Sequence, residues 1–160
     1  MSAPEALQWS AENCPIGRAA EVIGDRWTLL LLREVFQGVR RFDDLRVRTA
    51  IPRQVLTARL RRLVDQGLLR REPYREPGQR ARSEYRLTDK GIDLYPVLVA
   101  LQQWGSHYLS DPAGPPVEFE HRGCGGEIDL VLRCRAGHAV TANRQVVGRL
   151  GPGARRRAAS

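Results

Sequence analysis

Residues 51–67 read IPRQVLTARLRRLVDQG, and this stretch decides the fold class. Apolar residues recur here at the i, i+4, i+7 and i+8 spacing that places them on one face of a helix. They are Leu56, Leu60, Leu63 and Val64. Pro52 suits a first helical turn, and Gly67 follows the expected end. The stretch therefore predicts a helix that buries one stripe and exposes a polar, basic face.

The segments on both sides of this helix complete a motif. Residues 41–49 predict a short helix, so that two helices are joined by a tight link. Residues 68–72 and 83–87 predict strands, and the loop of residues 73–82 between them is rich in Pro and Gly. This order of elements predicts a helix-turn-helix followed by a β-wing.

Further helices are expected before and after this motif. Upstream, residues 15–24 and 25–36 predict two helices, with Asp25 as the cap of the second. Downstream, a long helix begins after Thr88, and Pro96 inside it is expected to kink or split it. The predicted fold class is mainly α with a small β-wing.

The polar face of the 51–67 helix carries side chains that read base edges in the major groove, where Gln pairs with adenine and Arg with guanine. Small residues on the same face allow close approach or contact with a thymine methyl. The expected DNA-contacting residues are Arg53, Gln54, Thr57, Ala58, Arg61 and Arg62 on the helix, and Arg75, Arg80 and Arg82 in the wing. Two alternatives remain open: an ordinary solvated helix face, or a winged helix that meets acidic protein or structured RNA.

The excess positive charge of the chain lies in this same region. The formal net charge is +8, and residues 40–86 contain 14 arginines against 6 acidic residues. The rest of the chain contains 12 basic and 12 acidic residues, so it is neutral. A charge excess confined to the helix-turn-helix and wing favours double-stranded DNA as the partner.

Several strings of residues together identify a family. They include Gly24-Asp25-Arg26-Trp27-Thr28, Arg41-Phe42-Asp43-Asp44-Leu45, Tyr85-Arg86-Leu87-Thr88 and Leu101-Gln102-Gln103-Trp104-Gly105. Because it contains these strings in this order, the chain resembles the HxlR-type winged helix-turn-helix regulators, a bacterial group related to the MarR-like proteins. The resemblance implies a transcriptional regulator that forms a homodimer through its N- and C-terminal helices. Each subunit would place one recognition helix in a half-site of a pseudo-palindromic operator, and either repression or activation is compatible with the family.

The resemblance covers only the middle of the chain, so we expect five segments. They are an N-terminal arm (1–12), the winged helix-turn-helix domain (13–109), a linker (110–116), a small β-rich C-terminal appendage (117–150) and a disordered basic tail (151–160).

Membrane and enzyme classes are not expected. No stretch approaches the roughly 20 apolar residues of a membrane helix, and the N-terminus lacks a signal-peptide pattern, which favours the cytoplasm. The sequence has no Gly-rich phosphate loop, nucleophile elbow or carboxylate pair in a plausible setting, so an enzyme is not expected.

Cys14 precedes Pro15 at the expected start of a helix. The helix dipole and Arg18, one turn on, favour its thiolate form, so oxidation of Cys14 could switch DNA binding. The family resemblance also implies this role, because some members use a cysteine at the matching position. The alternative is that Cys14 is a small residue packed at a helix cap.

A small effector bound near Trp27 and Trp104 is a further hypothesis, although such residues more often form the core or a dimer interface.

The appendage contains the pairs His121-x2-Cys124 and Cys134-x3-His138, separated by nine residues. Two imidazoles and two thiolates are the ligand set of a closed, structural zinc site. A module this small has little core, so a metal would contribute folding free energy. Two alternatives remain, because the cysteines could be small buried residues or form a labile disulfide.

Overall fold

The computed structural model describes residues 8–75 and 82–157. They divide into two units, one formed by residues 22–116 and the other by the residues outside that range. Among the described residues, no helix combines the length and apolar character needed to cross a membrane.

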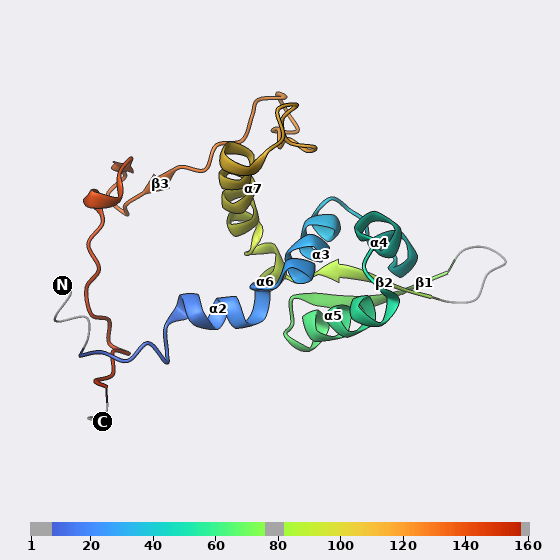
Figure 1. Cartoon of the computed structure of the whole chain (residues 1–160), viewed down its shortest axis with the longest axis horizontal. Helices are drawn as coiled ribbons and strands as arrows, with labels where there is room; N and C mark the ends of the chain where they lie inside the picture. Colours follow the sequence, from blue (N-terminus) through green and yellow to red (C-terminus); the bar gives the residue numbers. More distant parts are fainter. Residues whose placement is uncertain (1–7, 76–81, 158–160) are drawn as a thin grey trace. The chain divides into compact units, whose positions relative to one another are not determined.

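The unit of residues 22–116 is built on three helices that enclose a buried apolar core; Figure 1 shows the helices. They are α3 (Arg26–Phe36), α4 (Phe42–Thr49) and α5 (Arg53–Asp65). The buried core consists of Leu31, Leu32, Val35, Leu45, Ile51, Leu56, Leu60, Leu63, Leu68 and Leu69. The predicted apolar stripe of α5 is therefore confirmed, and Val64 packs partly buried against the same core.

The ends of these helices follow from local chemistry. Asp25 caps α3 as predicted, because its carboxylate accepts hydrogen bonds from the Thr28 backbone N–H at 3.1 Å and the Thr28 hydroxyl at 2.5 Å. The turn between α4 and α5 contains Ala50 with φ +54°, and its N–H donates to the Arg46 carbonyl oxygen at 2.9 Å. This left-handed conformation favours glycine, so Ala50 holds the helix-turn-helix angle at a conformational cost. Pro52 precedes α5, which starts one residue later.

The wing is a two-stranded antiparallel sheet of β1 (Leu69–Tyr74) and β2 (Arg82–Leu87). Compared with the predicted ranges, β1 begins one residue later and ends two residues later, and β2 begins one residue earlier. β1 contacts α5 and β2 contacts α4, and Figure 1 shows the hairpin projecting from between these helices. A bridge from Arg41 to Glu84 pairs the chain before α4 with β2. The fold is a winged helix-turn-helix, as the sequence predicts.

The predicted C-terminal helix is split in two. α6 (Asp89–Ile92) is followed by α7 (Tyr95–Leu109), and Pro96 lies in the first turn of α7. Proline has no N–H to donate and fits only the first turn of a helix without loss of a hydrogen bond. The expected break is therefore confirmed.

Side-chain hydrogen bonds link the C-terminal end of α5 to the start of α6. The Thr88 hydroxyl donates to the Gly67 carbonyl oxygen at 2.6 Å, and the Lys90 ammonium donates to the Gln66 carbonyl oxygen at 2.7 Å. A Cβ on the buried Gly91 would lie 2.2 Å from a neighbouring backbone carbonyl oxygen, so only glycine fits there. These contacts fix the position of the recognition helix relative to the wing and α6.

The second unit contains short elements. α2 (Pro15–Ile23), which lies across the boundary between the units, begins where the sequence predicts. In the appendage, β3 (Leu132–Arg133) pairs with β4 (Ala139–Val140), and a 3-10 turn, η1, spans Asn143–Gln145.

Part of the segment expected as a disordered tail, residues 151–157, lies within the described residues, and residues 158–160 lie outside them. Backbone hydrogen bonds of 2.8 and 2.9 Å join residues 8–10 to residues 155–157. The Arg156 guanidinium also lies 5.9 Å from the centroid of the Trp9 ring. Composition alone could not show this pairing, because the partner segment lies at the other end of the sequence.

Candidate nucleic-acid interface

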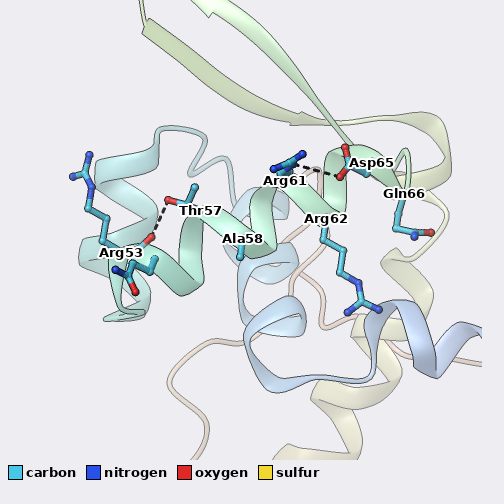
Figure 2. Close-up of a pocket in the computed structure, with 8 residues that line it drawn as sticks. Arg53, Thr57, Ala58, Arg61, Arg62, Asp65 and Gln66 are labelled. Atoms are coloured by element: carbon cyan, nitrogen blue, oxygen red, sulfur yellow. Dashed lines mark hydrogen bonds and ion pairs between the residues drawn. The ribbon is translucent and has the colours of Figure 1, made fainter.

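The outward face of α5 carries mainly polar and basic side chains (Figure 2). An open hollow along it is lined by Arg53, Gln54, Thr57, Ala58, Arg61, Arg62, Asp65 and Gln66. All eight residues are exposed, and Leu56, Leu60 and Leu63 fill the opposite, buried face of the helix. The structure thus brings together the six residues that the sequence assigns to the recognition helix.

Two contacts within α5 define what this face presents. The Thr57 hydroxyl donates to the Arg53 carbonyl oxygen at 2.9 Å, so its proton is engaged and it offers a methyl group and an acceptor lone pair outward. The Arg61 Nε atom lies 3.9 Å from the Asp65 carboxylate, and both side chains are highly exposed. Such an exposed ion pair is weak, so Arg61 exchanges it for another anionic partner at little cost.

The wing contributes further positive charge. Arg75 and Arg82 are exposed on its two sides, whereas the predicted contact Arg80 lies outside the described residues. The Arg82 Nη1 atom lies 4.0 Å from the Asp43 carboxylate of α4, another exposed and therefore weak ion pair.

A second hollow lies between α4, the start of α5 and the wing. We call it the wing hollow; its basic lining residues are Arg41, Arg53, Arg71 and Arg82. Asp43 and Asp44 also line it. Arg53 lines both hollows, so the two hollows meet at this residue.

Aromatic rings hold two of these arginines in place. The Arg41 guanidinium lies 4.5 Å from the centroid of the Tyr74 ring, and that of Arg53 lies 5.3 Å from the centroid of the Phe42 ring. A guanidinium over an aromatic face is stabilised electrostatically and loses little freedom when it meets an anion. The wing hollow is therefore suited to a phosphate group.

Sequence reasoning did not single out Arg41 and Arg71, which line the wing hollow. It assigned Arg41 to the start of a helix and Arg71 to the interior of a strand. The Arg71 Nη2 atom donates to the Ser83 hydroxyl at 3.2 Å across the hairpin, a contact that depends on strand register. The available signal was the concentration of arginine in residues 40–86, which includes both.

An ion pair with Asp25 links α5 to the start of α3. The Arg59 Nη1 atom of α5 lies 3.4 Å from the Asp25 carboxylate at the start of α3. Burial on its own raises the pKa of Asp25, but the Thr28 hydrogen bonds and the charge of Arg59 outweigh it and lower the pKa below its ordinary value. The ionised carboxylate thus joins α5 to α3.

A buried carboxylate joins α3 to α4. Glu34 is fully buried in α3, and its oxygens accept hydrogen bonds from Arg33 Nε at 3.0 Å and Arg48 Nε at 2.9 Å. Burial raises the pKa of Glu34, but the hydrogen bonds from Arg48 and Arg33 outweigh it, so the pKa is lowered. Because Arg48 comes from α4, this pair fixes the helix that precedes the recognition helix.

The candidate sensor residues lie outside this interface. Cys14 is half-buried at the start of α2, where its carbonyl oxygen accepts a hydrogen bond from the Arg18 N–H at 3.0 Å. Trp27 packs partly buried against the core, and Trp104 on α7 is 57% exposed.

The His/Cys residues of the appendage form two pairs. The Cys124 sulfur lies 3.3 Å from His121 Nδ1, and the Cys134 sulfur lies 3.4 Å from His138 Nδ1. Both cysteines are free and exposed rather than buried. Within residues 8–75 and 82–157, no group of three or more His, Cys, Asp or Glu side chains is placed to hold a metal.

Residues 22–113, which include the recognition helix and the whole wing, match the HxlR-like helix-turn-helix family. The chain belongs to this family. As an HxlR-like protein it is a transcriptional regulator with a helix-turn-helix DNA-binding domain, and its family is one of regulators rather than of enzymes. The family expected from the sequence is confirmed.

Relatives extend the similarity beyond the family domain. An uncharacterized HTH-type transcriptional regulator of Mycobacterium tuberculosis is 48% identical over 150 residues, which cover 93% of each chain. The crystal structure of a protein named as a transcription factor is similar with a TM-score of 0.76 and 36% identity, over 86% of this chain and 96% of that one. The redox regulator HypR in its oxidized form has a TM-score of 0.55 and 30% identity, over 61% of this chain and 100% of that one.

Proposed function

We propose that this HxlR-like protein binds a specific, pseudo-palindromic sequence of double-stranded DNA as a homodimer, and thereby represses or activates transcription. The observation that carries the proposal is the exposed polar face of α5, which is opposite its buried leucines and meets the wing hollow at Arg53. A helix that presents Arg, Gln, Thr and Ala in this way is suited to the major groove.

The residues of the two hollows have different roles in this proposal. Gln54 pairs with adenine, Arg53 and Arg61 pair with guanine, and the Thr57 methyl and Ala58 contact thymine methyl groups. Arg62 flanks the reading face. Arg41, Arg71 and Arg82 of the wing hollow contact the phosphate backbone together with Arg75 and Arg80, and so set affinity and orientation.

An apolar stripe on α7 supports the homodimer. Val97, Leu101, Trp104 and Tyr108 follow the i, i+4, i+7, i+11 spacing of one helix face, and each is between 42% and 64% exposed. Trp104 and Tyr108 pack their rings at a centroid distance of 5.4 Å. Burial of this stripe against the same stripe of a second copy would remove apolar surface from water and produce the two-fold symmetry that a palindrome requires.

We further propose that DNA binding responds to an effector, and that oxidation of Cys14 is one such signal. Its place at the start of α2 and the similarity to the redox regulator HypR support this. The test compares operator affinity before and after mild treatment with hydrogen peroxide in the wild type, Cys14→Ser and the control Cys124→Ser. Only Cys14→Ser should lose the response, and equal responses in all three would exclude Cys14 as the sensor.

The DNA-binding proposal is tested by selecting duplexes from a random pool with the purified full chain. We expect enrichment of an inverted repeat with half-sites about one helical turn apart, roughly 10 base pairs. Affinity should fall steeply with salt concentration and exceed the affinity for an unrelated duplex by about a thousandfold. No enrichment, or equal binding to structured RNA or an acidic protein, would refute sequence-specific DNA recognition.

A further inference from the structure

The appendage lacks the apolar core that normally stabilises a folded segment. None of residues 117–157 is buried. Apolar side chains face solvent there, with Val131, Leu132 and Val147 exposed by 58%, 61% and 77%. The strands β3 and β4 pair over only two residues each. A segment this small needs another source of folding free energy, such as a metal or a disulfide.

The first His/Cys pair lies at the tip of a tight turn. The Cys124 and Gly125 N–H groups both donate to the His121 carbonyl oxygen, at 3.1 and 2.8 Å, and the His121 N–H donates to the Gly126 carbonyl oxygen at 2.7 Å. Gly125 has φ +68°, which a residue with a side chain rarely adopts. The backbone thus holds the Cys124 sulfur 3.3 Å from His121 Nδ1.

The second pair also lies at a tight turn, at the tip of the β3–β4 hairpin. The Cys134 N–H donates to the His138 carbonyl oxygen at 3.0 Å, and the Gly137 N–H donates to the Cys134 carbonyl oxygen at 2.9 Å. Gly137 again has a positive φ, of +88°. The Cys134 sulfur lies 3.4 Å from His138 Nδ1.

These separations agree with those between ligands of tetrahedral zinc. With Zn–S of about 2.3 Å and Zn–N of about 2.0–2.1 Å, a tetrahedral angle places sulfur and nitrogen about 3.5 Å apart. Each tip is therefore a preformed two-atom chelate, and the tips together supply a Cys2His2 set. Such a set leaves no open coordination position, so its role is structural.

We propose that the appendage is a metal-dependent module in which His121, Cys124, Cys134 and His138 of one chain close around one divalent ion of the zinc class. The two tips stand apart in this structure, and nine residues (125–133) link them. The entropy cost of closing so short a loop is small compared with the affinity of structural zinc. On binding, each cysteine thiol releases one proton to solvent and its sulfur bonds the metal, while both imidazoles bind as neutral ligands.

This proposal does not rest on DNA recognition, because the four ligands lie outside residues 22–113. A metal could be absent while the helix-turn-helix still binds DNA, or present while it does not. The two proposals can therefore fail separately.

The test uses the full chain without a histidine tag, reconstituted with Zn²⁺ and dialysed. Elemental analysis should give one zinc per chain, and replacement by Co²⁺ should give the visible bands of tetrahedral cobalt with a thiolate charge-transfer band. Cys124→Ser and His138→Asn should each reduce bound zinc to near zero. The chain contains one cysteine and one histidine outside the set, so Cys14→Ser and His107→Asn are matched controls that should retain one equivalent.

Several results would overturn the proposal. The first is a zinc content no higher than that of the dialysis buffer. The second is two zinc ions per chain, one lost on substitution of each pair, and the third is one zinc ion shared by two chains. The last is an equal loss of zinc in the control variants.

A second measurement needs no variant. Removal of zinc with a chelator should speed tryptic cleavage after Arg122, Arg133 and Arg135 by about tenfold, while cleavage within residues 22–113 stays unchanged. Unchanged cleavage in the appendage would also contradict a structural metal.

Discussion

The Glu34 carboxylate, fully buried in the core helix α3, accepts a hydrogen bond of 2.9 Å from Arg48 at the far end of α4. The Arg48 side chain itself is 53% exposed, so an arginine at the surface forms the ion pair with the buried Glu34 carboxylate. A buried charge without a partner is costly, and the pair therefore makes the position of α4 dependent on Arg48.

Arg48→Met should lower the free energy of unfolding by about 2 kcal/mol, because it removes a charge-assisted hydrogen bond from a buried carboxylate. Urea denaturation at neutral pH measures the change. Arg46→Met, on the same helix, is the control and should stay within about 0.5 kcal/mol of the wild type. Equal effects of the two substitutions would show that Glu34 does not depend on Arg48.

The lowered pKa of Glu34 predicts acid sensitivity. Because the folded pKa lies below the unfolded value near 4.5, the stabilisation is fully present above pH 4.5 and is lost as the pH falls through the folded pKa. Urea midpoints measured from pH 7 down to pH 3 should fall less steeply for Glu34→Gln than for the wild type. Parallel curves would mean that other carboxylates account for the acid sensitivity.

Gln54→Ala and Arg82→Ala should affect DNA binding differently. Gln54→Ala should remove a preference of about 1–3 kcal/mol for adenine at one operator position, because its amide reads a base edge. Arg82→Ala should weaken binding to every sequence and reduce the slope of log affinity against log salt by about 1, because it contacts phosphate. Fluorescence anisotropy on operator and substituted duplexes measures both effects. The exposed Arg149 of the appendage is a control: Arg149→Ala should change neither. Equal loss for Gln54→Ala and Arg82→Ala on all sequences would refute this division.

Ala50→Gly should stabilise the protein by about 1 kcal/mol, because glycine adopts the left-handed conformation of this turn without a steric cost. Urea denaturation measures the gain. The same substitution inside α5, Ala58→Gly, should have the opposite sign and cost about 0.5–1 kcal/mol. Destabilisation by both substitutions would show that the φ of +54° at Ala50 is not a source of strain.

Leu101→Glu should convert the proposed homodimer to a monomer, because it places a charge in the middle of the apolar stripe of α7. Light scattering coupled to size-exclusion chromatography measures the mass in solution. Ser110→Glu, at the exposed end of the same helix, should remain dimeric. A dimer that survives Leu101→Glu would place the interface elsewhere.

Local signals in the sequence predicted most of the winged helix. The leucine stripe of α5, the cap at Asp25 and the break at Pro96 each depend on neighbours within a few residues, so spacing alone indicates them. The six recognition-helix residues share one exposed face for the same reason.

Contacts between distant parts of the chain could not be predicted. Nothing in the sequence around Glu34 indicates that Arg48, fourteen residues on, reaches its carboxylate. Arg41 and Arg71 enter the wing hollow only because α4 and the hairpin are folded side by side. The pairing of residues 155–157 with 8–10 likewise joins the two ends of the sequence.

Lys90 is the only lysine among the 26 basic residues of the chain, and its ammonium group donates to the last turn of the recognition helix at Gln66. Acetylation, or any amine-directed reagent acting on lysine side chains, therefore has a single target in this protein. Modification there would neutralise a positive charge at the negative end of the helix dipole and remove the hydrogen bond that ties α5 to α6. The arginine-rich composition thus leaves the proposed DNA-binding surface without a lysine, and the one lysine side chain lies at the junction of α5 and α6.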